Sequence, residues 1–332
     1  MSASSAIGVL VPTDGTAPTV PPNERPIGRA AAQLVAQGLD VIFGDTLHKG
    51  CISGFRIRGN QWEKADRIPV MGVHDRYPSQ IRAAQYENIR AELCGVPMGN
   101  SLEFTMLCRD KLAAQNAFHS AGVRMPPVAH DPNHFEARLK EWGSAFIKPQ
   151  FGALGIGVQR VQPGDVLPTH TTGVVENRPD PTILQAAIQP PSGWASKTVR
   201  VLIQRTPQGG WFSGIPVVRQ SRTDPVANAA RGAEVAPGPE VLSEKNLERI
   251  QQEVLSICGV LEQMKAANHM VEAGIDLVMD HNHEPWLIEI NSRPRGRMEV
   301  LASTNPATYL EAHINACARP LEVIAQWMKA ES

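Results

Sequence analysis

The sequence predicts a mixed α/β protein, with an α+β part, built from two or three domains. A chain of 332 residues, 42% of them hydrophobic, is long enough for a sizeable core. Residues up to about 106 alternate helix-like and strand-like segments, which is typical of an open-sheet α/β domain. Residues 274–279 and 285–291 alternate apolar and polar side chains, as the strands of a half-buried hairpin do.

Composition and charge exclude several classes of protein. Lys and Arg total 32 against 33 Asp and Glu, with no basic block, so neither nucleic acid nor a membrane surface is expected as a partner. The first residues lack a signal-peptide pattern, and no run approaches the length of a membrane span. The five cysteines are scattered without CxxC spacing, which favours reduced thiols: Cys51, Cys94, Cys108, Cys258 and Cys317. We therefore expect a cytoplasmic protein.

Strand-like and helix-like segments follow one another in the first third of the chain. We expect a strand at 7–11, a proline-rich loop, a helix leading into a buried strand over 29–44, strands at 52–59 and 67–73, and a helix over 78–93. His74, Asp75 and Arg76 directly follow a strand, where ligand sites at sheet edges tend to lie. An ordinary polar loop has the same composition.

A helix begins after Asp110 and ends at Gly122, just before Pro126 and Pro127. Lys111 lies in its first turn, close to the positive end of the helix dipole, where a cation gains nothing. We therefore expect Lys111 either to be exposed or to reach an anion held nearby.

A glycine-rich loop follows a strand that ends in Lys148. It contains Gly152, Gly155 and Gly157 and leads into a second strand at 158–161. Walker A loops and dinucleotide fingerprints both open a helix, so neither matches here. The loop is interpreted as a flap whose backbone N–H groups close over phosphates, with Lys148 as a point charge. A plain glycine-rich hairpin is the alternative.

An apolar strand at 182–189 carries Gln185, and a hairpin with Gly209 and Gly210 at its turn follows. A two-residue turn there would place Arg200 directly opposite Arg219. Paired arginines repel unless an anion such as a polyphosphate lies between them, and a bulge would break this register. Farther on, we expect a packing helix over 243–266, capped by Ser243, and a last helix over 306–330 that is interrupted near Pro320.

The hairpin at 274–291 contains the candidate metal ligands. A two-residue turn at 282–283 would set Asp276 opposite Glu289, with Asn291 on the same face. Two carboxylates and an amide oxygen would then converge, which suits Mg²⁺ or Mn²⁺, although a solvated hairpin face has the same pattern. The opposite face would carry Trp286, Ile288 and Ile290. His281 and His283 are interpreted as turn residues.

The candidate residues occur in a definite order: Asp110, Lys111, Lys148 with its glycine loop, Gln185, Arg200, Arg219, Asn228, Asp276, Glu289 and Asn291. In this order the chain resembles the ATP-grasp superfamily of ligases, which includes glutathione synthetase, D-alanine–D-alanine ligase and ribosomal-protein glutamate ligases. Four longer segments look most like its endospore-coat-associated (YheC/YheD-like) group: LHKGCISGFRIRGNQWEK, GVHDRYPSQIR, VRVLIQRTPQGGWFSGIPVVR and WLIEINSRPRGR.

The resemblance implies an ATP-grasp fold with a pre-ATP-grasp domain at 1–106, a central lid subdomain at 107–190 and a C-terminal antiparallel-sheet subdomain at 191–332. It implies that the ATP phosphates contact Lys111, Lys148 and the flap at 151–157. Gln185 would face the adenine, with the backbone of Ala187 and Ile188 beside the base. Asn228 would also contact the nucleotide, Asp276, Glu289 and Asn291 would hold one or two Mg²⁺ ions, and Arg200 and Arg219 would lie near the transferred phosphate. Thr198 departs from the family, because relatives usually have an acid there for the ribose.

The resemblance also implies a reaction. A substrate carboxylate attacks the γ-phosphate of ATP to give an acyl phosphate and ADP, and an amine then displaces phosphate to form a C–N or peptide bond. Such chemistry depends on charge neutralisation and positioning. A phosphotransferase, and a nucleotide-binding assembly or coat-associated protein without turnover, are the alternatives. The carboxylate substrate would be an amino acid, a peptide or a modified precursor. Candidate acid-binding or solvated arginines are Arg76, Arg293, Arg295 and Arg297. Dimers are common among related enzymes, so a homodimer is one expectation.

Overall fold

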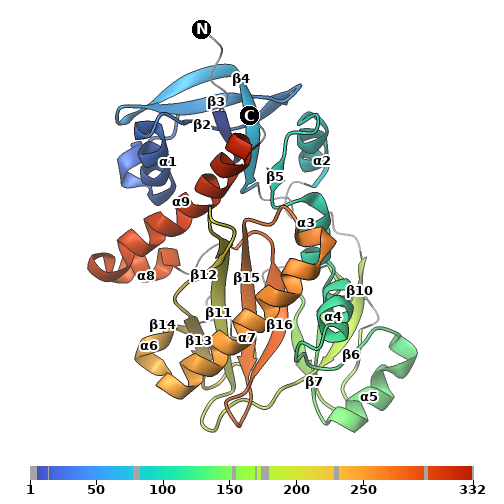
Figure 1. The fold of residues 1–332 in the computed structure, drawn as a ribbon. Coiled ribbons are helices and arrows are strands. Elements are labelled where there is room, and N and C mark those ends of the chain that lie inside the picture. The colour runs from blue at the N-terminus through green and yellow to red at the C-terminus, as the bar shows by residue number, and fades with distance from the viewer. Residues whose placement is uncertain are drawn as a thin grey trace.

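Three β-sheets, each with helices of its own, make up the protein (Figure 1). The computed structural model describes residues 6–13, 15–77, 83–151, 155–168, 170–172, 179–227, 232–294 and 298–330. The sheets follow one another along the chain and are built from strands within residues 6–99, 128–186 and 196–291. The predicted mixed α/β fold is therefore confirmed. No helix in these described ranges is both long and apolar enough to cross a membrane.

The first sheet has five strands in the order β1-β2-β3-β4-β5, and β1 also pairs with β4. Its elements are β1 (Ala6–Leu10), the 3-10 helix η1 (Pro22–Glu24), α1 (Pro26–Ala36), β2 (Asp40–His48), β3 (Cys51–Arg58), β4 (Gln61–Asp75), α2 (Ala83–Ala91) and β5 (Met98–Gly99). Because β4 has 15 residues, its first part pairs with β3 and its last part with β1 and β5. The predicted strands are confirmed, and of the predicted helix over 78–93 the structure describes the part from 83 onward.

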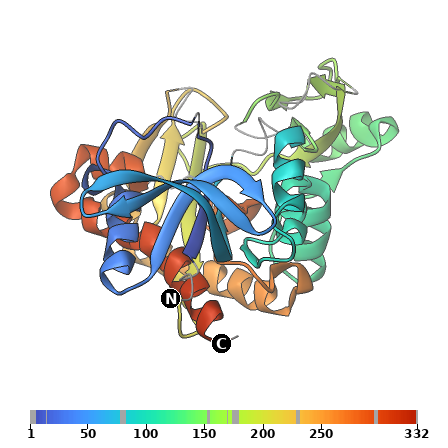
Figure 2. The same cartoon turned by 90° about the horizontal axis from the view of Figure 1, so that it is seen from above.

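The second sheet is antiparallel and lies beside the helices that precede it. The elements are α3 (Leu102–Arg109), α4 (Lys111–Ser120), β6 (Val128–Ala129), η2 (Pro132–His134), α5 (Phe135–Trp142), β7 (Ala145–Pro149), β8 (Gln159–Val161), β9 (His170–Thr172) and β10 (Pro179–Ala186). The helix predicted after Asp110 is α4, and Asp110 caps it by accepting hydrogen bonds from the backbone N–H groups of Leu112 (3.0 Å) and Ala113 (3.1 Å). Seen from above, this sheet and α5 project to one side (Figure 2).

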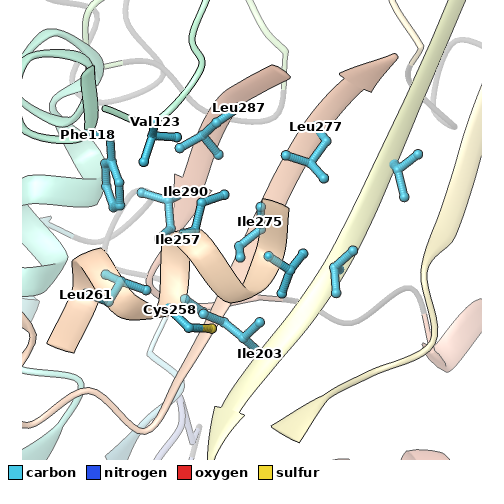
Figure 3. Close-up of a cluster of buried hydrophobic side chains, with 14 of the residues drawn as sticks. Phe118, Val123, Ile203, Ile257, Cys258, Leu261, Ile275, Leu277, Leu287 and Ile290 are labelled. Atoms are coloured by element: carbon cyan, nitrogen blue, oxygen red, sulfur yellow. The ribbon is translucent and has the colours of Figure 1, made fainter. Parts of the chain in front are cut away.

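The third sheet is antiparallel, in the order β14-β13-β11-β15-β16 with β12 paired to β11. Its elements are β11 (Ser196–Arg205), β12 (Trp211–Ser213), β13 (Val217–Ser221), β14 (Glu234–Pro237), α6 (Gly238–Val241), α7 (Glu244–Gln263), η4 (Lys265–Ala267), β15 (Glu272–Met279) and β16 (Pro285–Asn291). Ser243 caps α7, and Ile257 and Leu261 of this helix pack onto Ile275 and Ile290 of the sheet (Figure 3). Each such buried side chain stabilises the fold by about 1.5–3 kcal/mol.

The chain ends in α8 (Met298–Thr304) and α9 (Pro306–Ala330). The interruption predicted near Pro320 is wrong, because α9 is one helix of 25 residues with Pro320 inside it. Proline removes one backbone hydrogen bond. Leu321 and Ile324 are nevertheless completely buried against the first sheet, and Ile314 is buried beside α1, so packing on both sides holds the helix together.

The hairpin predicted around Gly209 and Gly210 has a longer turn than expected. Arg205 pairs with Trp211, so the connection spans residues 206–210, and the chain leaves the sheet again at 214–216. The predicted pairing of Arg200 with Arg219 is therefore wrong: Arg219 lies opposite Thr198 on β11. On its other side, Arg200 is paired with Asp276 of β15.

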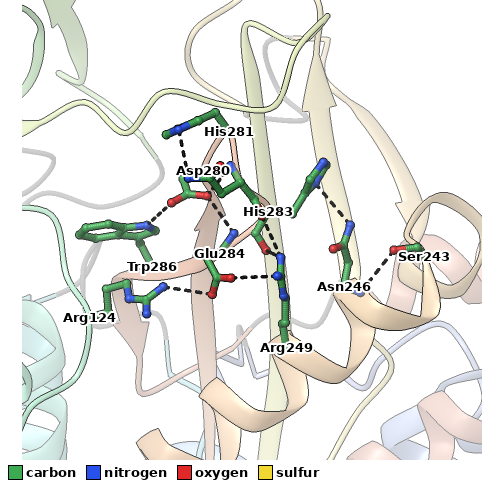
Figure 4. Close-up of polar contacts among 10 residues, drawn as sticks. Arg124, Ser243, Asn246, Arg249, Asp280, His281, His283, Glu284 and Trp286 are labelled. Atoms are coloured by element: carbon green, nitrogen blue, oxygen red, sulfur yellow. Dashed lines mark hydrogen bonds and ion pairs between the residues drawn. The ribbon is translucent and has the colours of Figure 1, made fainter.

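For the hairpin of β15 and β16, the predicted two-residue turn is wrong, but the predicted pairing of Asp276 with Glu289 is correct. Its connection spans 280–284, where Asp280 Oδ1 accepts hydrogen bonds from the N–H groups of Asn282 and Glu284, both at 2.8 Å (Figure 4). A one-residue register shift on β16 compensates for this longer turn, so Asp276 lies opposite Glu289 as predicted. The predicted face of Trp286, Ile288 and Ile290 is correct for Ile290, which lies in the core, and wrong for Ile288, because the extra residue turns Leu287 into the core and Ile288 toward the cavity.

Candidate functional site

One cavity of about 680 Å³ lies where the three sheets meet. Its lining comes from the carboxyl end of β4, from β7 and β10, from β11, β13, β15 and β16, and from the helices α3, α4 and α8. Predicted site residues that line it are Lys111, Lys148, Gly155, Gln185, Ala187, Ile188, Arg200, Arg219, Asp276, Glu289 and Asn291. The fold therefore brings together residues from the second and third sheets that are far apart in sequence.

Some predicted residues are not among that lining. Gly157 is described, has a φ of +72° and is two residues from Gly155. Gly152 and Asn228 lie outside the described residues, as do Arg295 and Arg297. Their predicted contacts therefore stay predictions.

Asp276 lies at the centre of the cavity and is bound by both arginines. Its Oδ1 accepts hydrogen bonds from Arg200 Nε (2.6 Å) and Arg219 Nη2 (2.7 Å), and Arg200 Nη2 also donates to Oδ2. Asn291 Nδ2 donates to Oδ2 at 3.1 Å. The anion between the two arginines is thus a carboxylate of the protein itself. Charge-assisted pairs of this kind fix the positions of both guanidinium groups.

Gly274 makes room for this arrangement. A Cβ at that position would come 3.0 Å from Cβ of Pro294 and 3.3 Å from Cδ of Arg200, which lies on the neighbouring strand β11. We expect Gly274→Ala to lower the free energy of unfolding by about 1–3 kcal/mol in urea titrations, because Arg200 or Pro294 must move. The matched control is Gly259→Ala in α7, where no atom lies within 4 Å of the added Cβ. It should stabilise by about 0.5–1 kcal/mol. Equal stability of the two variants would contradict this account of Gly274.

Lys148 and Lys111 place positive charge next to the acidic residues. Lys148 Nζ donates to Gln185 Oε1, and its ammonium also interacts electrostatically with Lys111, Glu289 and Asp276. Burial lowers the pKa of Lys148 to about 8, and the nearby charge of Lys111 adds to this effect, while Glu289 and Asp276 oppose it. Lys111 is half-buried in the first turn of α4 and lines the cavity, rather than being fully exposed. Two neighbouring lysines favour a polyanionic ligand.

The end of the cavity at Ala187 and Ile188 contains apolar side chains. Ala187 and Ile188 continue from β10, and the backbone N–H of Ala187 donates to the carbonyl of Ser144 at 3.0 Å. The Thr198 hydroxyl is buried beside them and, among the described residues, has no hydrogen-bond partner. An apolar slot with few polar groups fits the flat ring of a base.

A second polar cluster lies at the end of the cavity nearest the first sheet, and it contains Asp75 and Arg293, both of which the sequence indicated as candidates. Asp75 Oδ2 accepts from Arg293 Nη2 at 2.8 Å and from the Tyr86 hydroxyl, and Asp75 Oδ1 accepts from the N–H of Tyr77 at 3.0 Å. Arg293, one of the candidate acid-binding arginines, is thus tied to Asp75. Glu272, at the start of β15, is also present here.

The two histidines of the hairpin take no part in the cavity. His283 Nδ1 lies 3.3 Å from Asn246 Nδ2, and Arg249 Nη1 donates to the carbonyls of Asn282 (2.8 Å) and His283 (3.3 Å) (Figure 4). These contacts join the turn to α7, which agrees with their interpretation as turn residues. No group of three or more His, Cys, Asp or Glu side chains in the part of the chain that the structure describes is placed to hold a metal. The predicted set contains only two carboxylates, with Asn291.

Comparison with known proteins assigns the fold. Residues 165–311 match the YheC/D-like ATP-grasp family. The structure is similar to D-alanyl-alanine synthetase A from Vibrio cholerae (13% identity, TM-score 0.54, 97% of this chain and 99% of that chain). It is also similar to D-alanine-D-alanine ligase from Coxiella burnetii (14%, 0.54, 98% and 98%). An L-amino acid ligase from Bacillus licheniformis is similar too (15%, 0.52, 95% and 74%).

No match is found among curated proteins. At these identities, the structural similarity demonstrates the fold, and it extends over nearly the whole chain. The predicted resemblance is confirmed: the chain has the fold of the ATP-grasp ligases, and its residues 165–311 match the YheC/D-like ATP-grasp family.

Proposed function

We propose that the protein is an ATP-dependent carboxylate–amine ligase that works through an acyl phosphate, with an amino acid, a peptide or a similar small acid as substrate. The observation that carries this proposal is the convergence of two lysines, Lys111 and Lys148, with Asp276 and Glu289 in one cavity. The ligase activities of the structurally similar proteins support it. Phosphoryl transfer to a carboxylate requires neutralised charge and fixed geometry, which these residues supply.

The nucleotide would lie along the cavity. The base would occupy the apolar slot at Ala187 and Ile188, next to Gln185, and the phosphates would reach Lys148 and Lys111. Both arginines face the acidic centre, where the transferred phosphate would lie. The hydroxyl of Thr198 would replace the acid that relatives use for the ribose.

Asp276, Glu289 and Asn291 have the oxygen donors that Mg²⁺ or Mn²⁺ prefers. The two guanidinium groups on Asp276 already balance the charge of the two carboxylates, however. The residues therefore fit a cation that is also held by ATP phosphates, and they fit a free cation poorly. When bound, such an ion would neutralise charge on the phosphates, and Glu289 and Asn291 would orient it.

Metal binding should consequently depend on the nucleotide. In calorimetry, we expect no measurable binding of Mg²⁺ alone at millimolar concentration. Mg²⁺ should increase the affinity for a non-hydrolysable ATP analogue by about 5–150-fold, the usual range of coupling between two ligands. Glu289→Gln should reduce this increase. Tight binding of Mg²⁺ without nucleotide would contradict the charge balance described above.

The reaction conserves its atoms in two steps. An oxygen of the substrate carboxylate forms a bond to the γ-phosphorus of ATP, the bond from that phosphorus to the bridging oxygen breaks, and ADP leaves. The nitrogen of the amine then forms a bond to the acyl carbon, the bond from that carbon to the phosphate oxygen breaks, and phosphate leaves with a proton from the amine. Arg200 and Arg219 would stabilise the negative charge that gathers on the phosphate oxygens.

A substrate screen tests the proposal. The protein is incubated with ATP, Mg²⁺, amino acids and short peptides, and ADP and phosphate are both measured. We expect substrate-dependent release of equal amounts of the two. A stable phosphorylated product without free phosphate would identify a phosphotransferase. Nucleotide binding without turnover on any substrate would identify a binding or assembly protein.

Two further expectations belong to the proposal. A cytoplasmic location is supported by the five cysteines, each of which is a free thiol. A homodimer stays a prediction, and light scattering of the purified protein tests it.

A further inference from the structure

The strand β15 runs along the cavity, and its residues line the cavity at several points. Val278, Asp276 and Glu272 point to the same face at intervals of two or four residues, and all three line the cavity. Val278 lies toward the base end and Asp276 at the acidic centre. Glu272 follows about 13 Å farther along the strand, at 3.3 Å per residue. The cavity therefore continues well beyond the site proposed for the phosphates.

Glu272 is a buried carboxylate whose position is fixed by hydrogen bonds from Gln204, which is itself held by α9. Its side chain is 5% exposed. Gln204 Nε2 donates to Glu272 Oε2 at 3.1 Å and also to the carbonyl of Ala316 in α9 at 2.6 Å. Arg319 Nη1 donates to Gln204 Oε1 at 2.5 Å. These contacts fix the carboxylate with its other oxygen, Oε1, toward His74 and Arg76 at the carboxyl end of β4 in the first sheet.

Among the described residues, no group lies within hydrogen-bond distance of Glu272 Oε1. Arg76 Nη1 lies 3.8 Å away and His74 Nε2 3.7 Å away, both beyond hydrogen-bond distance. Burial lowers the pKa of His74 well below its usual value, so this ring is neutral and does not balance the carboxylate. Arg76 is thus the nearby cation for Glu272, and its side chain is 31% exposed.

The other charged groups at this end are either engaged or at the rim. Arg293 is bound to Asp75 and to Tyr86, as described above. Glu299 lies at the start of α8, is exposed and lines the same end. The hydroxyl of Tyr77 lies on a side chain with no exposed surface, and among the described residues it has no hydrogen-bond partner although Tyr77 lines the cavity. An unpaired buried hydroxyl is unfavourable, and it adds a polar group to this end of the cavity.

We propose that Arg76 and Glu272 form a subsite for a zwitterionic α-amino acid, which is the amine substrate of the ligase. Glu272 Oε1, with Glu299 at the rim, accepts hydrogen bonds from the ammonium group, and Arg76 donates to the carboxylate. An α-amino acid suits this pair because its ammonium and carboxylate groups are attached to the same carbon atom, so the ammonium can contact Glu272 while the carboxylate contacts Arg76.

The role as amine substrate follows from position and rests on the proposed function. ATP and the acid to be activated occupy the end with Lys148 and Asp276, so a ligand at Glu272 lies on the far side of the acyl phosphate. A substrate with only one charge would leave either Glu272 or Arg76 without a contact to the substrate, which is unfavourable for a desolvated charged group.

The test is a binding experiment on the whole protein. Each of the twenty protein amino acids is titrated by calorimetry as the free acid, the N-acetyl derivative and the carboxamide, with a non-hydrolysable ATP analogue and Mg²⁺ present. We expect at least one free amino acid to bind, and either blocked form to bind at least about tenfold more weakly. Arg76→Gln and Glu272→Gln should each weaken binding of that amino acid by the same order and leave affinity for the analogue unchanged.

Matched controls separate local from general effects. Arg58→Gln removes an arginine that pairs with Asp40 at 3.1 Å, and Glu141→Gln removes a glutamate that pairs with Arg138 at 2.6 Å, both outside the cavity. Neither should change amino acid binding. Arg76 is partly exposed, so its variant keeps the test valid if Glu272→Gln folds poorly.

The outcomes distinguish this proposal from the proposed function. If no free amino acid binds, if a blocked form binds equally well, or if both cavity variants keep normal affinity, the subsite is wrong even when ADP is formed. If an amino acid binds with the expected pattern but no second substrate supports ADP formation, the subsite stands as an amino acid site and the ligase proposal is wrong.

Discussion

Replacement of Glu289 by glutamine should lower the rate of substrate-dependent ADP formation by about 10²–10³-fold or more, because a fixed charge at the site of phosphoryl transfer is removed. Glu289 faces Asp276 across the hairpin and lines the cavity. It also raises the pKa of Lys148, so its removal makes the lysine easier to deprotonate. Glutamine keeps the shape of the side chain, and the free energy of unfolding in urea should change little. A coupled ADP assay measures the rate.

Glu284→Gln is the control for this variant. Glu284 lies in the same hairpin, outside the cavity, where it pairs with Arg124 at 3.2 Å and with Arg249 at 3.1 Å (Figure 4). Its replacement should leave the ADP rate within about twofold of the wild type, since exposed ion pairs contribute only about 0–1 kcal/mol. Full turnover by Glu289→Gln would remove Glu289 from the mechanism. Asp276 is a poorer target, because its loss would leave two buried guanidinium groups without a partner.

Lys148→Met should weaken ATP binding by about 10–100-fold, since a charged hydrogen bond to phosphate contributes about 1.5–3 kcal/mol. Lys148 has a pKa of about 8, so in the wild type it loses its charge as the pH rises through this value. ATP affinity should therefore fall between pH 7 and pH 9.5. Lys148→Arg keeps its charge over this range, and its affinity should stay nearly constant. Calorimetry at several pH values measures both.

The stability of the empty protein should change with pH in the opposite direction. Between about pH 8 and pH 10.5 the unfolded chain keeps the proton on Lys148 while the folded chain has lost it. The free energy of unfolding contributed by this group therefore increases across that window, because the unfolded state binds more protons. Lys140→Met, on the exposed face of α5, is the control, and it should leave both profiles unchanged. A pH-independent ATP affinity in the wild type would show that Lys148 does not contact the phosphates.

Alternation along the strands predicted much of the centre of the site. Asp276 and Glu289 face each other because side chains two residues apart share a face, and that pattern is visible in the sequence. The exact length of a turn leaves no such trace. The predicted two-residue turns at 209–210 and 282–283 are in fact the longer connections 206–210 and 280–284. The predicted pairing of Arg200 with Arg219 is wrong for this reason. The predicted pairing of Asp276 with Glu289 is nevertheless correct, because a bulge on β16 compensates for the longer turn.

Other parts of the site depend on contacts that no local pattern encodes. Asp75 and Arg293 are 218 residues apart in sequence and meet only because the first sheet is packed against the third. Glu272 could be predicted from the sequence, because it lies four residues before Asp276 on the same strand and therefore on the same face. Its burial, and the support from Gln204 and α9, depend on the complete fold.

Arg200 and Arg219 both pair with Asp276, and this fixes their side chains before any ligand binds. The side chains of Arg200 and Arg219 are only 16% and 11% exposed, and each is held by the same carboxylate. Long side chains that are free in solution lose about 1.5–2 kcal/mol of conformational entropy when they are ordered. Here that loss occurs when the protein folds and not when the substrate arrives. The arginines are therefore preorganised, and the binding free energy of a polyanion need not be spent on positioning them.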